Sequence, residues 1–135
     1  MVPFTRLRVE ELANIWDEGS QTPSQIALLG VFDATPFLRS DGSFDADAVR
    51  RELLLRADRV PALARRVIWT RFGEGRPVWA DDPSYDPSRH LECITLPDGE
   101  DFLDWSTDRT VRRLDLDRLL WRIEIVDGLP GGGSG

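Results

Sequence analysis

The sequence predicts an α/β or α+β fold in which helices pack on a mixed β-sheet. Apolar residues recur at helical spacing over 7–18, over 45–60 and in a stretch that starts near residue 98. Between these stretches lie short apolar or alternating runs bounded by glycine, proline or aspartate, at 26–32, 67–72, 77–80, 90–96 and 121–126. The resulting order, helix–strand–helix–hairpin–strand–helix–strand, is typical of a layer of helices on a sheet.

Composition limits the classes of function. The chain has 135 residues, 41% of them hydrophobic, which suits one globular domain or part of one. Its net charge of −7 argues against nucleic acid as a partner, because phosphate binding needs concentrated positive charge. Cys93 is the only cysteine, so no intramolecular disulfide can form and a reducing compartment fits. The N-terminus lacks a signal-peptide core and no apolar run is long enough to span a bilayer, so we expect a cytoplasmic protein.

The first apolar segments predict a helix followed by a strand. The helix covers roughly residues 7–18 and is amphipathic, and Gly19-Ser20 should end it. Its apolar face carries Leu12, Ile15 and Trp16. Residues 26–32 form an apolar run broken by one glycine, which predicts a strand buried on both faces. Asp41-Gly42-Ser43 then predicts a turn.

The helix over 45–60 has the clearest start signal. Asp45 suits the N-cap position, where a carboxylate accepts a hydrogen bond from the first turn. Glu52 precedes Arg56 at the favourable ion-pair spacing, and Pro61 sets the limit of the helix. The expected inward stripe is Val49, Leu53, Ala57 and Val60.

The second half predicts a hairpin, a strand, a helix and a last strand. Residues 67–72 and 77–80 should pair across a turn at 73–75, and a proline-containing loop leads to a strand at 90–96. A helix that starts near Asp98 carries Phe102, Trp105 and Arg109. The last strand turns Trp121, Ile123 and Ile125 to one face and Arg122, Glu124 and Val126 to the other, and Asp127-Gly128 predicts a turn after it.

The residues that could carry chemistry do not form a recognisable site. His90 is the only histidine, and on a strand it would face away from Cys93, three residues on, so the two cannot form a dyad. We therefore interpret them as a histidine at a strand start and a small buried thiol. Two ligands are also too few for a structural zinc site.

Charged and aromatic clusters also have structural explanations. Acidic groups occur at Asp81-Asp82, at Asp98-Glu100-Asp101-Asp104, and at Asp115 with Asp117. Such groups can serve acid–base chemistry or bind a cation, but acids at turns and helix starts are commonly structural. Arginine pairs occur at Arg50-Arg51, Arg65-Arg66 and Arg112-Arg113, where solvated ion pairs are the commoner outcome. The five tryptophans are expected to anchor the core. Residue chemistry alone thus predicts no catalytic, cofactor or metal residue.

Several motifs resemble the N-terminal part of the wax ester synthase/diacylglycerol acyltransferase family. Pro23-Ser-Gln-Ile-Ala-Leu-Leu-Gly-Val-Phe-Asp33 is similar to the family's first strand, commonly Pro-Met-His-Val-Gly and ending near Phe-Asp. Val60-Pro-Ala-Leu-Ala-Arg-Arg66 is similar to its "Leu…Arg-Arg" segment. Gly75-Arg-Pro-Val-Trp-Ala-Asp-Asp-Pro-Ser-Tyr-Asp-Pro-Ser-Arg-His90 is close to "Gly-x-Pro-x-Trp-x-x-Asp-Pro-x-Phe-Asp-x-x-x-His". Leu114 to Leu129 resembles "Pro-Leu-Asp-x-x-Arg-Pro-Leu-Trp…Gly-Leu", and Thr5 to Glu18 resembles the opening helix.

The resemblance implies part of the N-terminal lobe of a chloramphenicol-acetyltransferase-like fold. Family members transfer an acyl group from acyl-CoA to a long-chain alcohol or to diacylglycerol, and no metal or cofactor is implied. Their catalytic histidine lies in a His-His-x-x-x-Asp-Gly motif that no residue here matches, and His90 aligns with a different histidine. Three departures put substrate preference in doubt: Arg8 where aspartate is favoured, Gln25 where histidine is common, and Leu119 in place of a proline.

The first hypothesis is an N-terminal acyltransferase fragment, inactive alone. Residues 1–130 would form a partial lobe and 131–135 a Gly-rich tail or linker, with Leu120 and Trp121 walling an acyl tunnel or packing against the other lobe. Its partners would be acyl-CoA, the alcohol or diacylglycerol, and the remaining lobe, with peripheral contact to membranes or lipid inclusions. A free sheet edge would favour self-association. The alternatives are a non-catalytic interaction module of the same fold and a condensation-type domain that acts on carrier-protein thioesters.

Overall fold

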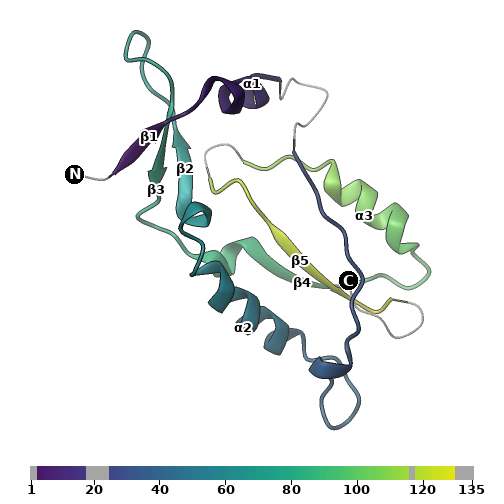
Figure 1. The fold of residues 1–135 in the computed structure, drawn as a ribbon. Coiled ribbons are helices and arrows are strands. Elements are labelled where there is room, and N and C mark those ends of the chain that lie inside the picture. Colours follow the sequence, from purple (N-terminus) through teal and green to yellow (C-terminus); the bar gives the residue numbers. More distant parts are fainter. Residues whose placement is uncertain (1–2, 18–24, 116–117, 130–135) are drawn as a thin grey trace.

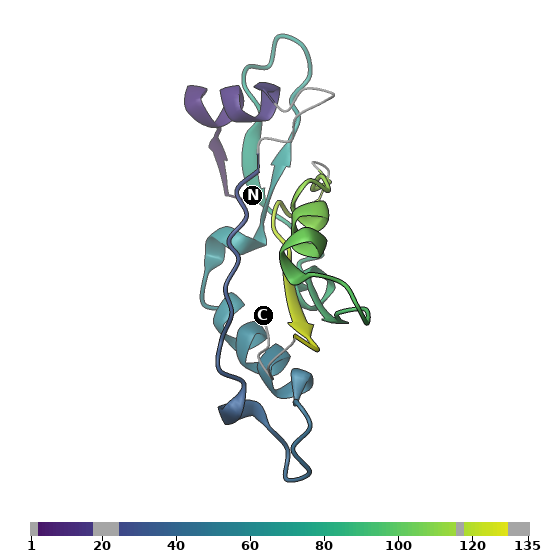
Figure 2. The same ribbon diagram turned by 90° about the vertical axis from the view of Figure 1, so that its right-hand side faces the viewer.

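The computed structural model describes residues 3–17, 25–115 and 118–129. Within them lie two small sheets and three α-helices, in an elongated arrangement (Figures 1 and 2). The predicted helix end at Gly19-Ser20, the acid Asp117 and the tail at 131–135 lie outside the described residues. The predicted mixture of helices and strands is confirmed, with antiparallel pairing in one sheet and parallel pairing in the other.

The antiparallel sheet stands at one end of the molecule. Its central strand β3 (Val78–Asp81) pairs with β2 (Arg65–Ile68) and with β1 (Phe4–Arg6), a strand that the sequence did not indicate. The predicted hairpin is confirmed, but its first strand covers Arg65–Ile68 and not 67–72. Its loop turns at Gly73 and Gly75, whose φ angles of 89° and 96° suit glycine. Helix α1 (Val9–Asp17) follows β1 and buries Leu12, as predicted.

The parallel sheet contains β4 (Leu91–Thr95) and β5 (Ile123–Asp127), in register from Leu91 opposite Ile123. Parallel neighbours need a crossover connection, and this one carries α3 (Phe102–Thr110). Helix α2 (Ala46–Ala57) packs against both strands. Figure 1 shows α2 and α3 on either side of the strand pair. Ile125 and Val126, which point to opposite faces of β5, are both buried, as expected for a parallel sheet covered by helices.

Capping side chains fix where the helices begin. Asp45 Oδ1 accepts a hydrogen bond from the Ala48 amide at 3.0 Å, which confirms the predicted N-cap of α2. The predicted start of α3 near Asp98 is wrong by a turn, because Asp101 accepts from the first amides of the helix. The stripe of α2 ends at Ala57: Val60 lies beyond the helix and is 46% exposed.

The strand predicted at 26–32 does not form. These residues are extended but belong to no strand of either sheet, and the side chains of Ile26 and Leu28 are almost fully exposed. A strand needs a hydrogen-bonding neighbour, and no described strand of either sheet lies beside this run. Figure 2 shows the segment running along the length of the molecule, apart from the parallel sheet. Residues 25–34 are called the extended segment below.

The tryptophans are not all core anchors, contrary to prediction. Trp16 is 71% exposed and Trp69 is 44% exposed, whereas Trp79, Trp105 and Trp121 are half-buried. Small and aliphatic side chains make up the core instead. The buried apolar residues are Leu7, Leu12, Ala34, Ala57, Val67, Ala80, Leu91, Leu96, Leu119, Ile125 and Val126.

Candidate functional site

An apolar groove lies between the parallel sheet and the extended segment. Its volume is about 1230 Å³. Helices α2 and α3 both contribute to its walls, with Leu53 from the first and Trp105 from the second. The extended segment contributes Ile26 and Leu28. The groove is therefore built from four parts of the chain that are distant in sequence.

The groove follows the open edge of β5. Four consecutive residues, Ile123 to Val126, line it. Because successive side chains of a strand point to opposite faces, a cavity that touches all four must lie at the edge of the strand rather than over one face. β5 pairs with β4 on its other side, and within the described residues no further strand pairs with β5. The backbone amides and carbonyls of this edge thus face the groove without a strand partner.

Leu120 and Trp121, the predicted wall residues, both line this groove and are half-buried. The indole Nε1 of Trp121 donates a hydrogen bond to the Leu63 carbonyl at 2.8 Å. The Trp121 carbonyl lies 3.1 Å from His90 Nδ1, and the two rings are 5.1 Å apart. These contacts anchor Trp121 at the head of β5, and they explain His90 as a structural partner of that tryptophan.

A charge cluster joins α3 to β5 at the groove. Arg109 donates two hydrogen bonds to the Glu124 carboxylate, from Nε at 2.9 Å and from Nη2 at 2.6 Å. Arg122 Nε also lies 3.0 Å from Glu124, and the Arg109 guanidinium stands 5.1 Å from the ring centre of Trp105. The Arg109 and Glu124 side chains are only 18% and 13% exposed. The hydrogen bonds to Glu124 raise the pKa of Arg109, which stays charged.

The Gln25 side chain attaches the extended segment to the end of α3. The Gln25 amide donates to the carbonyls of Thr110 and Arg112, and its oxygen accepts from the Leu114 amide at 3.3 Å. Gln25 therefore satisfies backbone groups just after α3, where the last carbonyls of a helix lack internal partners. Sequence reasoning noted Gln25 only as a departure from a family pattern and missed this role.

The other candidate residues are dispersed. Cys93 is exposed, contrary to the predicted buried thiol, and its Sγ lies 3.9 Å from the Ala46 carbonyl. Desolvation raises the pKa of this thiol. Asp81 pairs with Arg65 at 3.5 Å, and Arg50 donates to the Ser88 carbonyl at 3.0 Å.

The acidic residues that the structure describes form no metal-binding group. Within the ranges that the structure describes, no three His, Cys, Asp or Glu side chains are grouped so that they could hold a metal ion. The same ranges contain no helix with the length and apolar character needed to cross a bilayer.

Comparisons with known proteins identify the family. Residues 12–134 match the family model of the wax ester synthase/diacylglycerol acyltransferase catalytic domain. A probable diacylglycerol O-acyltransferase of Mycobacterium tuberculosis, tgs3, is 27% identical over 128 residues, which are 93% of this chain and 45% of that protein. A putative diacylglycerol O-acyltransferase of Mycobacterium bovis is 36% identical over 72 residues, 44% of this chain and 16% of that protein.

The fold agrees with a solved structure. The wax ester synthase/diacylglycerol acyltransferase from Marinobacter aquaeolei VT8 superposes with a TM-score of 0.75 at 19% identity, over 96% of this chain and 31% of that one. The chain thus spans less than half the length of these relatives. These matches confirm both the resemblance and the acyltransferase-type fold inferred from the motifs, and the chain belongs to the wax ester synthase/diacylglycerol acyltransferase catalytic domain family.

Proposed function

We propose that this chain is the N-terminal part of an acyl-CoA-dependent O-acyltransferase that acylates a long-chain alcohol or diacylglycerol. The match of residues 12–134 to the catalytic-domain family supports this assignment. So do the names of relatives in Mycobacterium, which describe diacylglycerol O-acyltransferases. Residues 1–130 form the partial lobe in this proposal, and 131–135 form a tail or linker.

The groove is the surface that receives the rest of the enzyme. An open edge of β5, covered above and below by α2 and α3, has room and hydrogen-bonding groups for one more strand. The extended segment on the far side supplies a second backbone. Leu120 and Trp121 then wall the junction, where an acyl chain would meet apolar side chains.

The proton-abstracting histidine of the reaction belongs elsewhere in the enzyme. His90 is the only histidine of this chain, and its ring is engaged by the backbone and side chain of Trp121. A general base must reach the acceptor hydroxyl directly or through one water. We therefore expect no CoA release above background when this chain alone is incubated with palmitoyl-CoA and hexadecanol or diacylglycerol.

Complementation tests the assignment. The chain is co-expressed with the part of tgs3 that follows its matched region, and complex formation and CoA release are measured. We expect a stable complex that releases CoA, and we expect Trp121→Asp to prevent assembly. Leu55→Asp is the matched control, because Leu55 is 60% exposed and does not line the groove. Assembly without CoA release would favour the non-catalytic interaction module, and turnover by this chain alone would refute the assignment.

A further inference from the structure

Gln25 holds the start of the extended segment through its side-chain amide. Nε2 donates to the carbonyls of Thr110 and Arg112, the second at 2.9 Å, and Oε1 accepts from the Leu114 amide at 3.3 Å. A side-chain amide has two N–H donors and one acceptor oxygen, so glutamine can make all three hydrogen bonds at once. The contact therefore depends on the chemistry of the amide and not only on its size.

The other end of the extended segment is fixed by burial and by a turn. Ala34 is buried, and Asp33 Oδ1 accepts hydrogen bonds from the amide and the hydroxyl of Thr35 at 2.9 and 2.6 Å. Between the two ends, Ile26 and Leu28 are almost fully exposed, and the segment belongs to neither sheet. Its position relative to the parallel sheet therefore depends strongly on how its ends are held.

The end of α3 joins both sides of the groove. Arg109, in the last turn of α3, donates to Glu124 of β5, and Arg122 Nη2 donates to the Arg109 carbonyl at 3.3 Å. Gln25 binds carbonyls that follow directly after Arg109. β5 and the extended segment lie on opposite sides of the groove, and both are thus tied to the same stretch of chain.

We propose that Gln25 is a positioning residue that fixes the width of the groove for the part of the enzyme that follows this chain. The inference rests on the proposed function, in which that part docks beside β5. A binding surface that is already in place avoids the cost of ordering it when the partner arrives. Without these hydrogen bonds the start of the extended segment would lose its fixed position, and docking would include the cost of ordering it. Gln25 thus acts through the extended segment and not on the reacting atoms.

Two substitutions separate hydrogen bonding from packing. Gln25→Met keeps a long side chain but makes none of the three hydrogen bonds. Gln25→His can make at most two of them, because a neutral imidazole has one donor and one acceptor. Hydrogen bonding therefore predicts that Gln25 holds the segment best and methionine worst. Packing alone would favour methionine, the most apolar of the three side chains, so the two explanations predict opposite orders.

Distances between spin labels test the attachment on this chain alone. Labels are placed at Leu28→Cys in the extended segment and Leu103→Cys in α3, both exposed, in a Cys93→Ser background because Cys93 is also exposed. We expect a narrow distance distribution with Gln25, a broader one with Gln25→His and the broadest with Gln25→Met. The control pair, Leu55→Cys/Leu103→Cys, joins two exposed helix positions outside the groove and should give the same distribution in all three.

Docking affinity tests the consequence for assembly. The chain is titrated with the part of tgs3 that follows its matched region, and Kd is measured by calorimetry. We expect Kd to rise about tenfold in Gln25→Met, since ordering the segment costs as much as immobilising a few side chains. The rise should be smaller in Gln25→His, which keeps part of the attachment.

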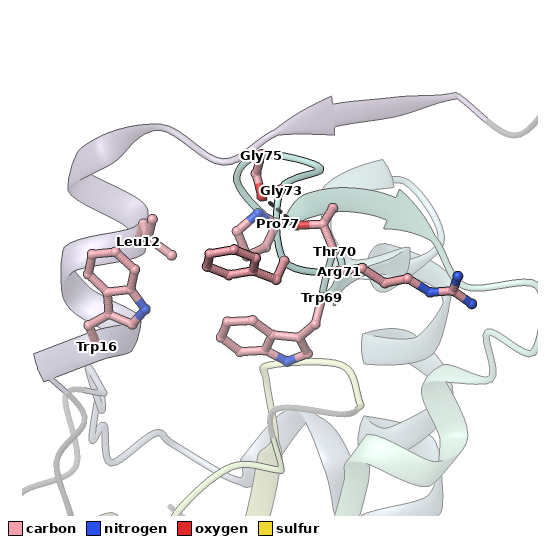
Figure 3. A pocket seen from close by; sticks show the side chains of 9 residues that line it. Leu12, Trp16, Trp69, Thr70, Arg71, Gly73, Gly75 and Pro77 are labelled. Atoms are coloured by element: carbon pink, nitrogen blue, oxygen red, sulfur yellow. Dashed lines mark hydrogen bonds between the residues drawn. The ribbon is translucent and has the colours of Figure 1, made fainter.

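The hairpin end of the molecule supplies the control for docking. A shallow pocket of about 510 Å³ lies there, lined by Leu12 and Trp16 of α1 and by Trp69 and Pro77 (Figure 3). None of the described residues that line this pocket also lines the groove. Phe72, another residue of this pocket, is fully exposed, so Phe72→Ser should dock with the Kd of the unaltered chain.

Two sets of results would overturn the proposal. One is an equal label distribution, or an equal Kd, in the unaltered chain and in Gln25→Met. The other is tighter docking by Gln25→Met than by Gln25→His. If the unaltered chain does not bind the tgs3 part at all, the proposed assembly is refuted, whereas the label distances still decide whether Gln25 positions the extended segment.

Discussion

Glu124→Ala should destabilise the fold more than any change to a surface ion pair. Glu124 accepts hydrogen bonds from Arg109 at 2.6 and 2.9 Å and lies 3.0 Å from Arg122. Alanine would leave two guanidinium groups without this anion, one of them on a side chain that is only 18% exposed. Glu92, 3.5 Å from Arg109, is 61% exposed and could compensate only in part.

The expected cost follows from the burial of the pair. Removing one partner of a buried ion pair costs about 3–5 kcal/mol, because the remaining charge is left in a poorly solvated place. The residual exposure of Arg109 and Glu124 places this pair at the lower end, at about 3 kcal/mol. For a chain of this size that loss lowers the melting temperature by roughly 10 °C.

Urea unfolding followed by tryptophan fluorescence measures the loss. Glu52→Ala is the control, because Glu52 pairs with Arg56 at 2.8 Å on an exposed helix face, where such pairs contribute about 0.3–0.5 kcal/mol. The double variant Arg109→Met/Glu124→Leu should recover most of the stability, since it removes both buried charges. If Glu124→Ala cost no more than Glu52→Ala, the cluster would not join α3 to β5 as argued.

Three other measurements test the remaining contacts. Gln25→Ala removes the attachment to the carbonyls of Thr110 and Arg112, so limited proteolysis within 26–34 should become faster while the sheet amides keep their protection from hydrogen exchange. Hydrogen bonds from a Ser or Thr two residues on lower the pKa of Asp33, Asp41, Asp82 and Asp86. Their contribution to stability is therefore present above the unfolded pKa and lost as the pH falls through the folded pKa. The urea concentration at the unfolding midpoint should decrease as the pH is lowered from roughly 5 to 2, and it should decrease less steeply in Ser84→Ala. The raised pKa of Cys93 predicts slower alkylation by iodoacetamide at neutral pH than that of free cysteine, and a faster rate would contradict the desolvation of this thiol.

Features with a local signal were predictable. The N-cap at Asp45, the ion pair of Glu52 with Arg56 and the hairpin turn at 73–75 depend on residues within a few positions of one another. The chain folds there as spacing and turn chemistry indicate. The start of α3 was misplaced because Asp98 and Asp101 are both acceptable caps, and only the backbone decides between them.

The candidate site depends on contacts between residues that are distant in the sequence, and the periodicity of apolar residues cannot predict such contacts. Leu120 and Trp121 were singled out through a family resemblance, and the structure places both in the groove. The pairing of Arg109 with Glu124 spans the crossover between α3 and β5, and the Gln25 contact spans most of the chain. No spacing rule links such residues, so only the fold shows them to be neighbours.

The wrong strand prediction at 26–32 carries information about the groove. Its composition is that of a strand buried on both faces, yet Ile26 and Leu28 are almost fully exposed. The open edge of β5 has the converse mismatch, because its polar backbone groups face an apolar groove. In the assembly proposed above, an additional strand beside β5 would give its open edge a hydrogen-bonding partner and would cover exposed side chains of the extended segment. We therefore infer that both anomalies mark the packing surface proposed for the remainder of the acyltransferase.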